Sequence, residues 1–215
     1  MAMFSQSDLA IIREAVEQAD QRTRGEIVPM VVPASARYRD ASYVAGFILA
    51  LVALAVSLSL DDGWSRPRWS AHHSGWIIIG VLAAYTLGVF MGRVPAIIRL
   101  LTSDERMAMK VRLRAERAFY EQGLHKTREG TGILILLSVL ERRAQILADR
   151  AIDARVPPGT WDALVQTLVA GIQAGRPAEA FCQVVARGGD LLAVHFPAHE
   201  GDNPNELPDE LIHGT

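Results

Sequence analysis

Two long stretches without Asp, Glu, Lys or Arg constrain the fold of this chain more than any other feature. They cover residues 41–60 and residues 69–92, and the apolar part of the second begins at Trp76. A helix needs about 20 apolar residues, and at least about 17, to cross a bilayer. Neither stretch has the polar stripe typical of a helix in a soluble core. They predict transmembrane helices over about residues 42–60 and 76–93, the alternative being two very apolar core helices.

The linker at residues 61–68 is too short for a domain, so the two helices are expected to form an antiparallel hairpin. Lys and Arg favour the cytoplasmic side of a membrane. The linker has only Arg66 and Arg68, whereas the flanks carry Arg22, Arg24, Arg37, Arg39, Arg93, Arg99, Arg106, Lys110 and Arg112. We therefore predict a multi-pass protein of the cell inner (plasma) membrane with both termini in the cytoplasm. The charged first forty residues are expected to be folded protein, not a targeting segment.

Small residues recur every four positions in the second apolar stretch, at Gly80, Ala84, Gly88 and Gly92. Small residues let two helix backbones approach closely in a membrane. One interpretation is packing within the hairpin, against Gly46 and Ala50. The other is a seam for a homodimer or for another membrane protein.

Both flanks of the hairpin show α/β patterning. A helix capped by Ser5 or Ser7 is followed by a short strand over residues 26–32, in which Pro29 favours an edge or a bulge. After the hairpin, Thr102 and Glu105 form a capping box for a helix that ends near Gly123. A continuous apolar run over residues 132–138 predicts a central strand, and residues 144–149 are expected to return as its hairpin partner. The remaining elements are helices from Thr160 and from Pro177 and an acidic extended tail.

A lone strand with one helix cannot bury its faces, so the hairpin is expected to be an insertion in one α/β domain. This divides the chain into residues 1–40, the first part of the domain, and residues 41–95, the hairpin. Residues 96–198 form the rest of the domain, and residues 199–215 form the tail.

The order of several short motifs resembles the TPM domain family. The motifs are the runs at residues 23–28, 131–135 and 141–144, the Gly123-Leu124 and Lys126-Thr127 pairs, and Ala148-Asp149. The ending His195-Phe196-Pro197, with residues 205–208, resembles its small bacterial membrane-associated branch. The resemblance implies a compact α/β/α sandwich split by the inserted transmembrane hairpin. It also implies weak acid-phosphatase activity and calcium binding, as in some relatives, or an auxiliary or assembly role, as in others. Ala151 stands where relatives usually have Gly, and many relatives carry the domain outside the cytoplasm.

Asp149 is the first candidate for a site because it follows a strand, where α/β folds tend to bind ligands. With Glu26, at the start of another strand, it could hold calcium through carboxylate oxygens. The alternative is that Asp149 caps the following loop. Arg142 and Arg143 could hold an anion or a phosphate, although a solvated turn is the simpler interpretation.

Four basic residues, Arg106, Lys110, Arg114 and Arg117, are spaced along one face of the helix after the hairpin. They could contact anionic lipid headgroups, or form ion pairs with Glu116 or Glu121. The net charge of −2 gives no reason to expect nucleic-acid binding. Cys182 is the only cysteine, which excludes disulfides within the chain and cysteine metal clusters.

Neither a phosphate-binding glycine loop nor a nucleophile motif is visible in the sequence. We therefore favour a non-catalytic membrane protein that assists, assembles or scaffolds partners. The alternative is a weak metal-dependent phosphatase, possible if Asp149 and Glu26 or Arg142 share a pocket.

Overall fold

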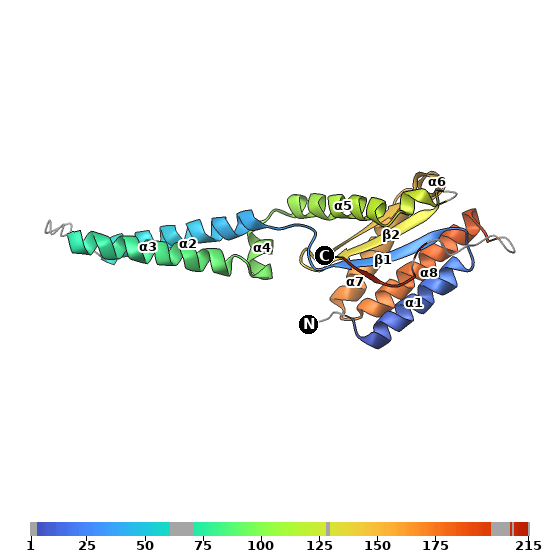
Figure 1. Ribbon diagram of the computed structural model, residues 1–215, viewed down its shortest axis with the longest axis horizontal. Helices are drawn as coiled ribbons and strands as arrows, with labels where there is room; N and C mark the ends of the chain where they lie inside the picture. The colour runs from blue at the N-terminus through green and yellow to red at the C-terminus, as the bar shows by residue number, and fades with distance from the viewer. Residues whose placement is uncertain (1–3, 61–70, 128–129, 199–206, 208, 215) are drawn as a thin grey trace. The chain divides into compact units, whose positions relative to one another are not determined.

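The computed structural model describes residues 4–60, 71–127, 130–198, 207 and 209–214. The chain forms two compact units, one made of Met1–Ala36 with Ala108–Thr215 and the other of Arg37–Met107. The first unit holds a sheet with its covering helices, and the second holds the long apolar helices (Figure 1). The predicted linker at residues 61–68 and most of the acidic tail lie outside the described residues.

The sheet has the strand order β3-β2-β1-β4. β1 (Glu26–Val32) lies parallel to β2 (Gly132–Ser138), in a register that runs from Glu26 opposite Gly132 to Val32 opposite Ser138. This confirms the prediction that the strand before the hairpin pairs with the strands after it. β3 (Arg143–Ala148) is the predicted antiparallel partner of β2. β4 (Ile212–His213) is a short fourth strand, formed by the end of the predicted tail.

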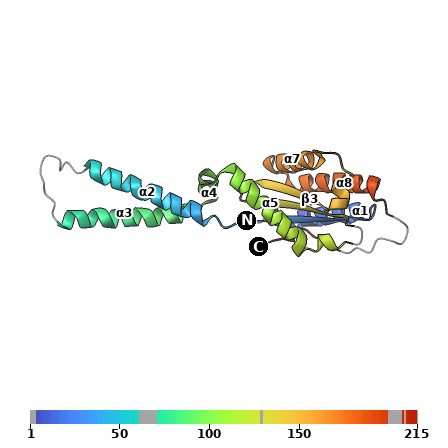
Figure 2. The same cartoon turned by 90° about the horizontal axis from the view of Figure 1, so that it is seen from above.

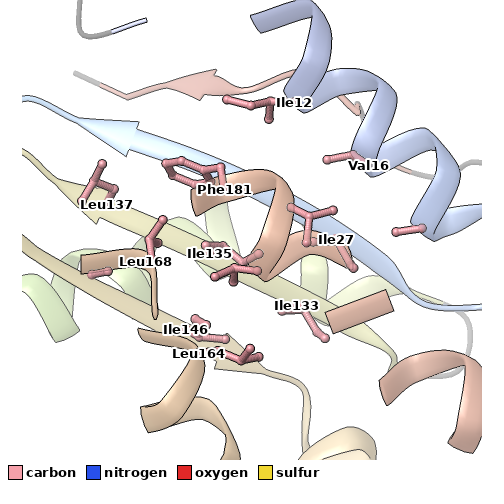
Figure 3. Packing of buried hydrophobic residues seen from close by; sticks show 14 of the residues in the cluster. Ile12, Val16, Ile27, Ile133, Ile135, Leu137, Ile146, Leu164, Leu168 and Phe181 are labelled. Carbon is pink, nitrogen blue, oxygen red and sulfur yellow. The ribbon is translucent and has the colours of Figure 1, made fainter. Parts of the chain in front are cut away.

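Helices cover both faces of this sheet, which makes a mixed α/β fold (Figure 2). On one face lie α1 (Gln6–Asp20), α6 (Arg150–Asp153), α7 (Thr160–Gln173) and α8 (Pro177–His195). Figure 3 shows their packing, with Phe181 of α8 and Leu168 of α7 close to Ile135 and Leu137 of β2. On the other face, α5 (Asp104–Glu121) buries Val111, Ala115 and Ala118, and η2 (Leu124–Lys126) adds Leu124.

The two central strands are apolar except for Glu26 at the start of β1 and Ser138 at the end of β2, because both of their faces are buried. Ile27 and Val31 pack in one core and Val28, Met30 and Val32 in the other. Pro29 was predicted to mark an edge strand or a bulge, but β1 is not an edge strand, since β4 pairs with its outer side. That pairing covers only Met30 and Val31, so the ladder beside Pro29 is one-sided, where a missing N–H is tolerated.

Two boundaries differ from the sequence prediction. α5 begins at Asp104, and Thr102 instead ends α4 (Pro95–Leu101), a short helix that the charge pattern did not predict. An N-cap at Thr102 would make Ser103 the first helical residue, so α5 begins one residue later than predicted. For α1 the cap is Ser5, whose side chain accepts a hydrogen bond from the backbone N–H of Asp8.

The second unit contains α2 (Arg39–Leu60) and α3 (Ala71–Met91), which lie side by side (Figures 1 and 2). By length and composition, the segment Arg39–Ser59 of α2 can cross a membrane. Gly75–Met91 meets the same criterion only together with α4, and the two helices are bent by 100°. Among the described residues, one helix is therefore long and apolar enough by itself to cross a membrane, where the sequence predicted two spans.

Glycines let α2 and α3 approach closely. A Cβ atom added at Gly88 would lie 2.7 Å from the carbonyl oxygen of Ala45 and from the Cα of Gly46. One added at Gly92 would lie 2.6 Å from the Cα of Ser42. Gly80, by contrast, has nothing within 4 Å of such an atom. Half of the small-residue series therefore packs within the hairpin, as one interpretation proposed.

Candidate functional site

The motif residues at 23–28 and 131–135 lie at one end of the sheet, where β1 and β2 begin. The Thr23 hydroxyl accepts a hydrogen bond from Gly25 N–H at 2.8 Å, and the Thr131 hydroxyl donates to the Arg24 carbonyl at 2.9 Å. The N–H of Glu26 donates to the Thr131 carbonyl. A Cβ atom at Gly25 would lie 2.9 Å from that same carbonyl oxygen, so a side chain has no room there. These residues set the register of the two parallel strands.

Asp149 lies at this same end of the sheet, immediately after β3. It is the N-cap residue of α6, and its Oδ1 accepts a hydrogen bond from Arg150 N–H at 2.6 Å. Its own N–H donates to the carbonyl of Gly132 at 2.9 Å. Its carboxyl group also faces Gly130, a residue with φ of 64° that glycine adopts without strain. These contacts agree with the interpretation that Asp149 caps the segment after β3 and do not require a bound metal.

Glu26 and Asp149 flank Gly132 on opposite sides, because Glu26 pairs with Gly132 in the β1–β2 ladder. Two strand spacings separate their backbones by about 10 Å. A calcium ion binds its oxygen ligands at about 2.3–2.6 Å, so a shared ion would need both side chains to reach across β2. Among the described residues, no group of three or more His, Cys, Asp or Glu side chains is placed to hold a metal ion.

Glu26 instead lies near a buried carboxyl group, that of Asp20, which sequence reasoning missed. Asp20, at the end of α1, is 6% exposed and lies near both Glu26 and Asp209. Burial, reinforced by the charges of Glu26 and Asp209, raises the pKa of Asp20 to about 9. Asp20 is therefore a neutral carboxylic acid at neutral pH. Asp20 and Glu26 are only six residues apart, but Asp209 joins them through the pairing of β4, which has no local sequence signal.

Arg142 and Arg143 lie at the other end of β3 from Asp149. β3 has six residues, so about 20 Å of strand separates the two ends. Arg142 has φ of 53° in the turn before β3. The neighbouring Glu141 is buried, and its carboxylate accepts hydrogen bonds from Ser35 N–H at 2.9 Å and from the Ser138 hydroxyl. The structure does not bring Arg142 and Asp149 together in one pocket.

The basic stripe of α5 has acidic partners. Arg106 pairs with Asp40, and Arg117 and Arg114 both pair with Glu121, at 2.6 Å and 3.1 Å. The hydrogen bond from Arg117 and the nearby charges of Arg117 and Arg114 hold the pKa of Glu121 below its ordinary value. The Arg114 side chain is only 13% exposed. Ion pairs and lipid contacts thus compete for the same side chains, and contact with lipid headgroups stays a prediction.

Comparison with known proteins agrees with this architecture. Residues 96–190 match the family model of the TPM domain. The solved structure "NMR structure of BA42 protein from the psychrophilic bacteria Bizionia argentinensis sp. nov." is similar, with a TM-score of 0.59 and 16% identity, covering 98% of this chain and 95% of that one. At such identity the likeness concerns the fold alone. No curated protein matches the sequence. The matched residues supply α5, β2, β3 and most of the helical layer packed on them, so this part of the chain is similar to the TPM domain.

Proposed function

We propose that this chain is an integral membrane protein in which the α2–α3 hairpin anchors the TPM domain, and that the domain has an auxiliary, assembly or scaffolding role. The observation that carries the proposal is the surface of the hairpin. Large apolar side chains are exposed along both helices, with Trp76 73% and Phe90 69% exposed. The others include Phe47, Leu51, Val52, Leu58, Ile79, Leu82 and Leu87.

A lipid environment accounts for this surface better than water does. Soluble monomers rarely expose contiguous apolar patches of more than a few hundred Å². α2 has 22 residues and α3 has 21, which at 1.5 Å per residue gives about 32 Å, close to the thickness of a hydrocarbon core. Within α2 the charged residues are Arg39 and Asp40, both in its first turn. These lengths support the proposal that α3 crosses the bilayer beside α2, with cytoplasmic termini as the distribution of Lys and Arg predicts.

The non-catalytic role is supported by the structural use of the candidate side chains. Asp149 caps α6, and Glu141 joins the end of β2 to the segment after β1. Thr23 and Thr131 hold the starts of two strands. A phosphatase would need Asp149 to act as a metal ligand in place of this cap. Calcium titration of Asp149 variants separates the two functions.

Extraction of membranes tests the anchor. The full chain should stay in the pellet after alkaline carbonate and leave it only with detergent. A variant in which a Gly/Ser linker replaces residues 37–103 should be soluble and folded, because closing a longer or shorter loop changes stability slowly. Release of the full chain by carbonate would overturn the membrane assignment. Aggregation of the replaced variant at every linker length would show that the domain does not fold without its hairpin.

A further inference from the structure

The short helix α4 is amphipathic, although it directly follows the apolar hairpin. At about 100° per residue, its apolar side chains spread over about 160° of the helix, and Arg99 lies opposite the middle of that arc. The arc consists of Leu100, Ile97, Leu101 and Ile98. Leu100 is 82% exposed, whereas Ile98 is buried. A helix with an apolar face and a basic opposite face is typical of a membrane interface.

The bend between α3 and α4 gives this helix a defined direction. The two axes differ by 100°. If α3 crosses the bilayer, α4 must therefore run roughly parallel to the bilayer surface at the end of the hairpin. α4 also contacts α2, so both helices of the hairpin determine its position.

The backbone of the bend is suited to a region poor in water. The N–H groups of Gly92, Arg93 and Val94 donate to the carbonyls of Gly88, Phe90 and Met91 at 2.8–3.2 Å. Pro95, the first residue of α4, has no N–H group, and those of Ile97 and Ile98 both donate to Val94. Few donors are left to be satisfied, which matters because an unsatisfied backbone group is costly within a membrane.

We infer that α4 is an interfacial helix that lies along the bilayer surface, with Leu100, on the exposed part of the apolar arc, among the lipid acyl chains just below the headgroups and Arg99 toward water. This inference rests on the proposed membrane function and adds a lipid-binding surface beyond the two spans. The partner is the lipid bilayer itself. Arg93, exposed at the start of the bend, lies at a height where a basic side chain can reach headgroup phosphates.

Accessibility of spin labels in the full chain tests this directly. Single cysteines replace Leu100, Arg99, Val52 or Ser103 in a Cys182→Ala background, and the labelled protein is placed in phosphatidylcholine–phosphatidylglycerol vesicles. Oxygen concentrates among acyl chains and a charged nickel complex stays in water, so their collision rates measure depth. Leu100 and Val52 are exposed within the protein, so labels there replace no core contact. Ser103 is exposed and serves as the aqueous reference.

The label at Leu100 should collide several-fold more with oxygen than with nickel, at a depth between those of Val52 and Ser103. The label at Arg99 should show the reverse preference. If the label at Leu100 lies in water while the label at Val52 lies deep among the acyl chains, the interfacial helix is refuted but α2 is still a membrane span. Aqueous labels at both Leu100 and Val52 would overturn the membrane function and this inference together. A label at Leu100 as deep as that at Val52 would also refute the interfacial position.

Discussion

The carboxyl group of Asp20, at the end of α1, accepts a hydrogen bond from the backbone N–H of Ile27 in β1, with an Oδ1–N distance of 3.3 Å. This contact joins a helix to the start of a central strand, in a place where Asp20 is almost fully buried. Its neighbours Glu26 and Asp209 come from the start of β1 and from the segment before β4. The ionisation of Asp20 is therefore linked to the stability of the sheet.

We predict that Asp20→Asn stabilises the protein increasingly as the pH rises. The pKa of Asp20 is raised from 3.8 to about 9 by burial and by its acidic neighbours. A raised pKa means that the folded state retains the proton, so the cost of ionisation is absent below about pH 4 and complete above about pH 9. Because asparagine removes that cost, the gain in free energy of unfolding should grow by up to about 4 kcal/mol between pH 4 and pH 7. Chemical denaturation in detergent at several pH values measures it.

The matched control for this prediction is Asp190→Asn in α8. Asp190 pairs with Arg22 at 2.8 Å, but both side chains are at least half exposed, so the change should matter little at any pH. An effect of Asp20→Asn that is the same at pH 4 and pH 7 would contradict an elevated pKa.

Gly88→Ala should loosen the hairpin, whereas Gly80→Ala should not. The new methyl group at Gly88 meets backbone atoms of Ala45 and Gly46, which cannot rotate away, at a cost of about 1–3 kcal/mol. At Gly80 the methyl group enters open space. Unfolding of the full chain by increasing SDS in mixed micelles measures the difference. Equal midpoints for the two variants would count against the observed packing.

Gly80 also tests the proposed homodimer. If a second copy packs against the Gly80 and Ala84 face, Gly80→Ile should weaken self-association in energy-transfer measurements between labelled copies in vesicles. The hairpin itself should keep its stability, because a Cβ atom added at Gly80 meets no atom of the described residues within 4 Å. Unchanged energy transfer would remove this face as a dimer seam.

The role of Asp149 can be read from two substitutions. If Asp149 acts only as an N-cap, Asp149→Asn should leave the free energy of unfolding unchanged, and Asp149→Ala should lower it by about 1 kcal/mol. As a calcium ligand, Asp149 should support a rise in the melting temperature with millimolar calcium, and both variants should abolish that rise. A protein that does not respond to calcium leaves Asp149 with its capping role only.

Labelling of cysteines in intact cells tests the topology. In a Cys182→Ala background, a cysteine at Ser65 in the linker should react with a membrane-impermeant reagent, and one at Ala163 should react only after permeabilisation. Ala163 lies on the exposed side of α7, so its reactivity reports the location of the domain. This topology is predicted from the excess of basic residues on the flanks of the hairpin. External labelling at Ala163 would place the α/β domain outside the cytoplasm.

The basic stripe of α5 can be tested in the soluble variant in which a linker replaces residues 37–103. This variant keeps Arg106 and the rest of the stripe. It should bind acidic vesicles at low salt and release as salt rises, since each basic residue near an anionic surface contributes about 1 kcal/mol over a Debye length of about 8 Å. Changing Arg106, Lys110, Arg114 and Arg117 to Gln should abolish binding. The control changes Arg13, Arg22, Arg176 and Arg187, which alters the net charge equally. Equal losses in both variants would show that only net charge matters.

Local pattern determined much of this fold. The continuous apolar run of β2 indicated a strand buried on both faces, and the Ala144 strand was identified as its hairpin partner. The small residues at Gly88 and Gly92 were identified as packing positions. Such features depend on the period of apolar residues, on glycines and on turns, which lie within a few residues of one another.

Other features were decided only by tertiary structure. The direction of α4 depends on its packing against α2, and no charge pattern in residues 95–101 marks the 100° bend. β4 forms because Leu211 and Ile212 pack into the cores on opposite faces of the sheet. Its partner strand β1 ends at Val32, almost 180 residues earlier in the chain. The approach of Asp209 to Asp20 follows from that pairing. Long-range pairing and burial are set by the whole chain, so a local sequence window contains no signal of which carboxyl groups will meet.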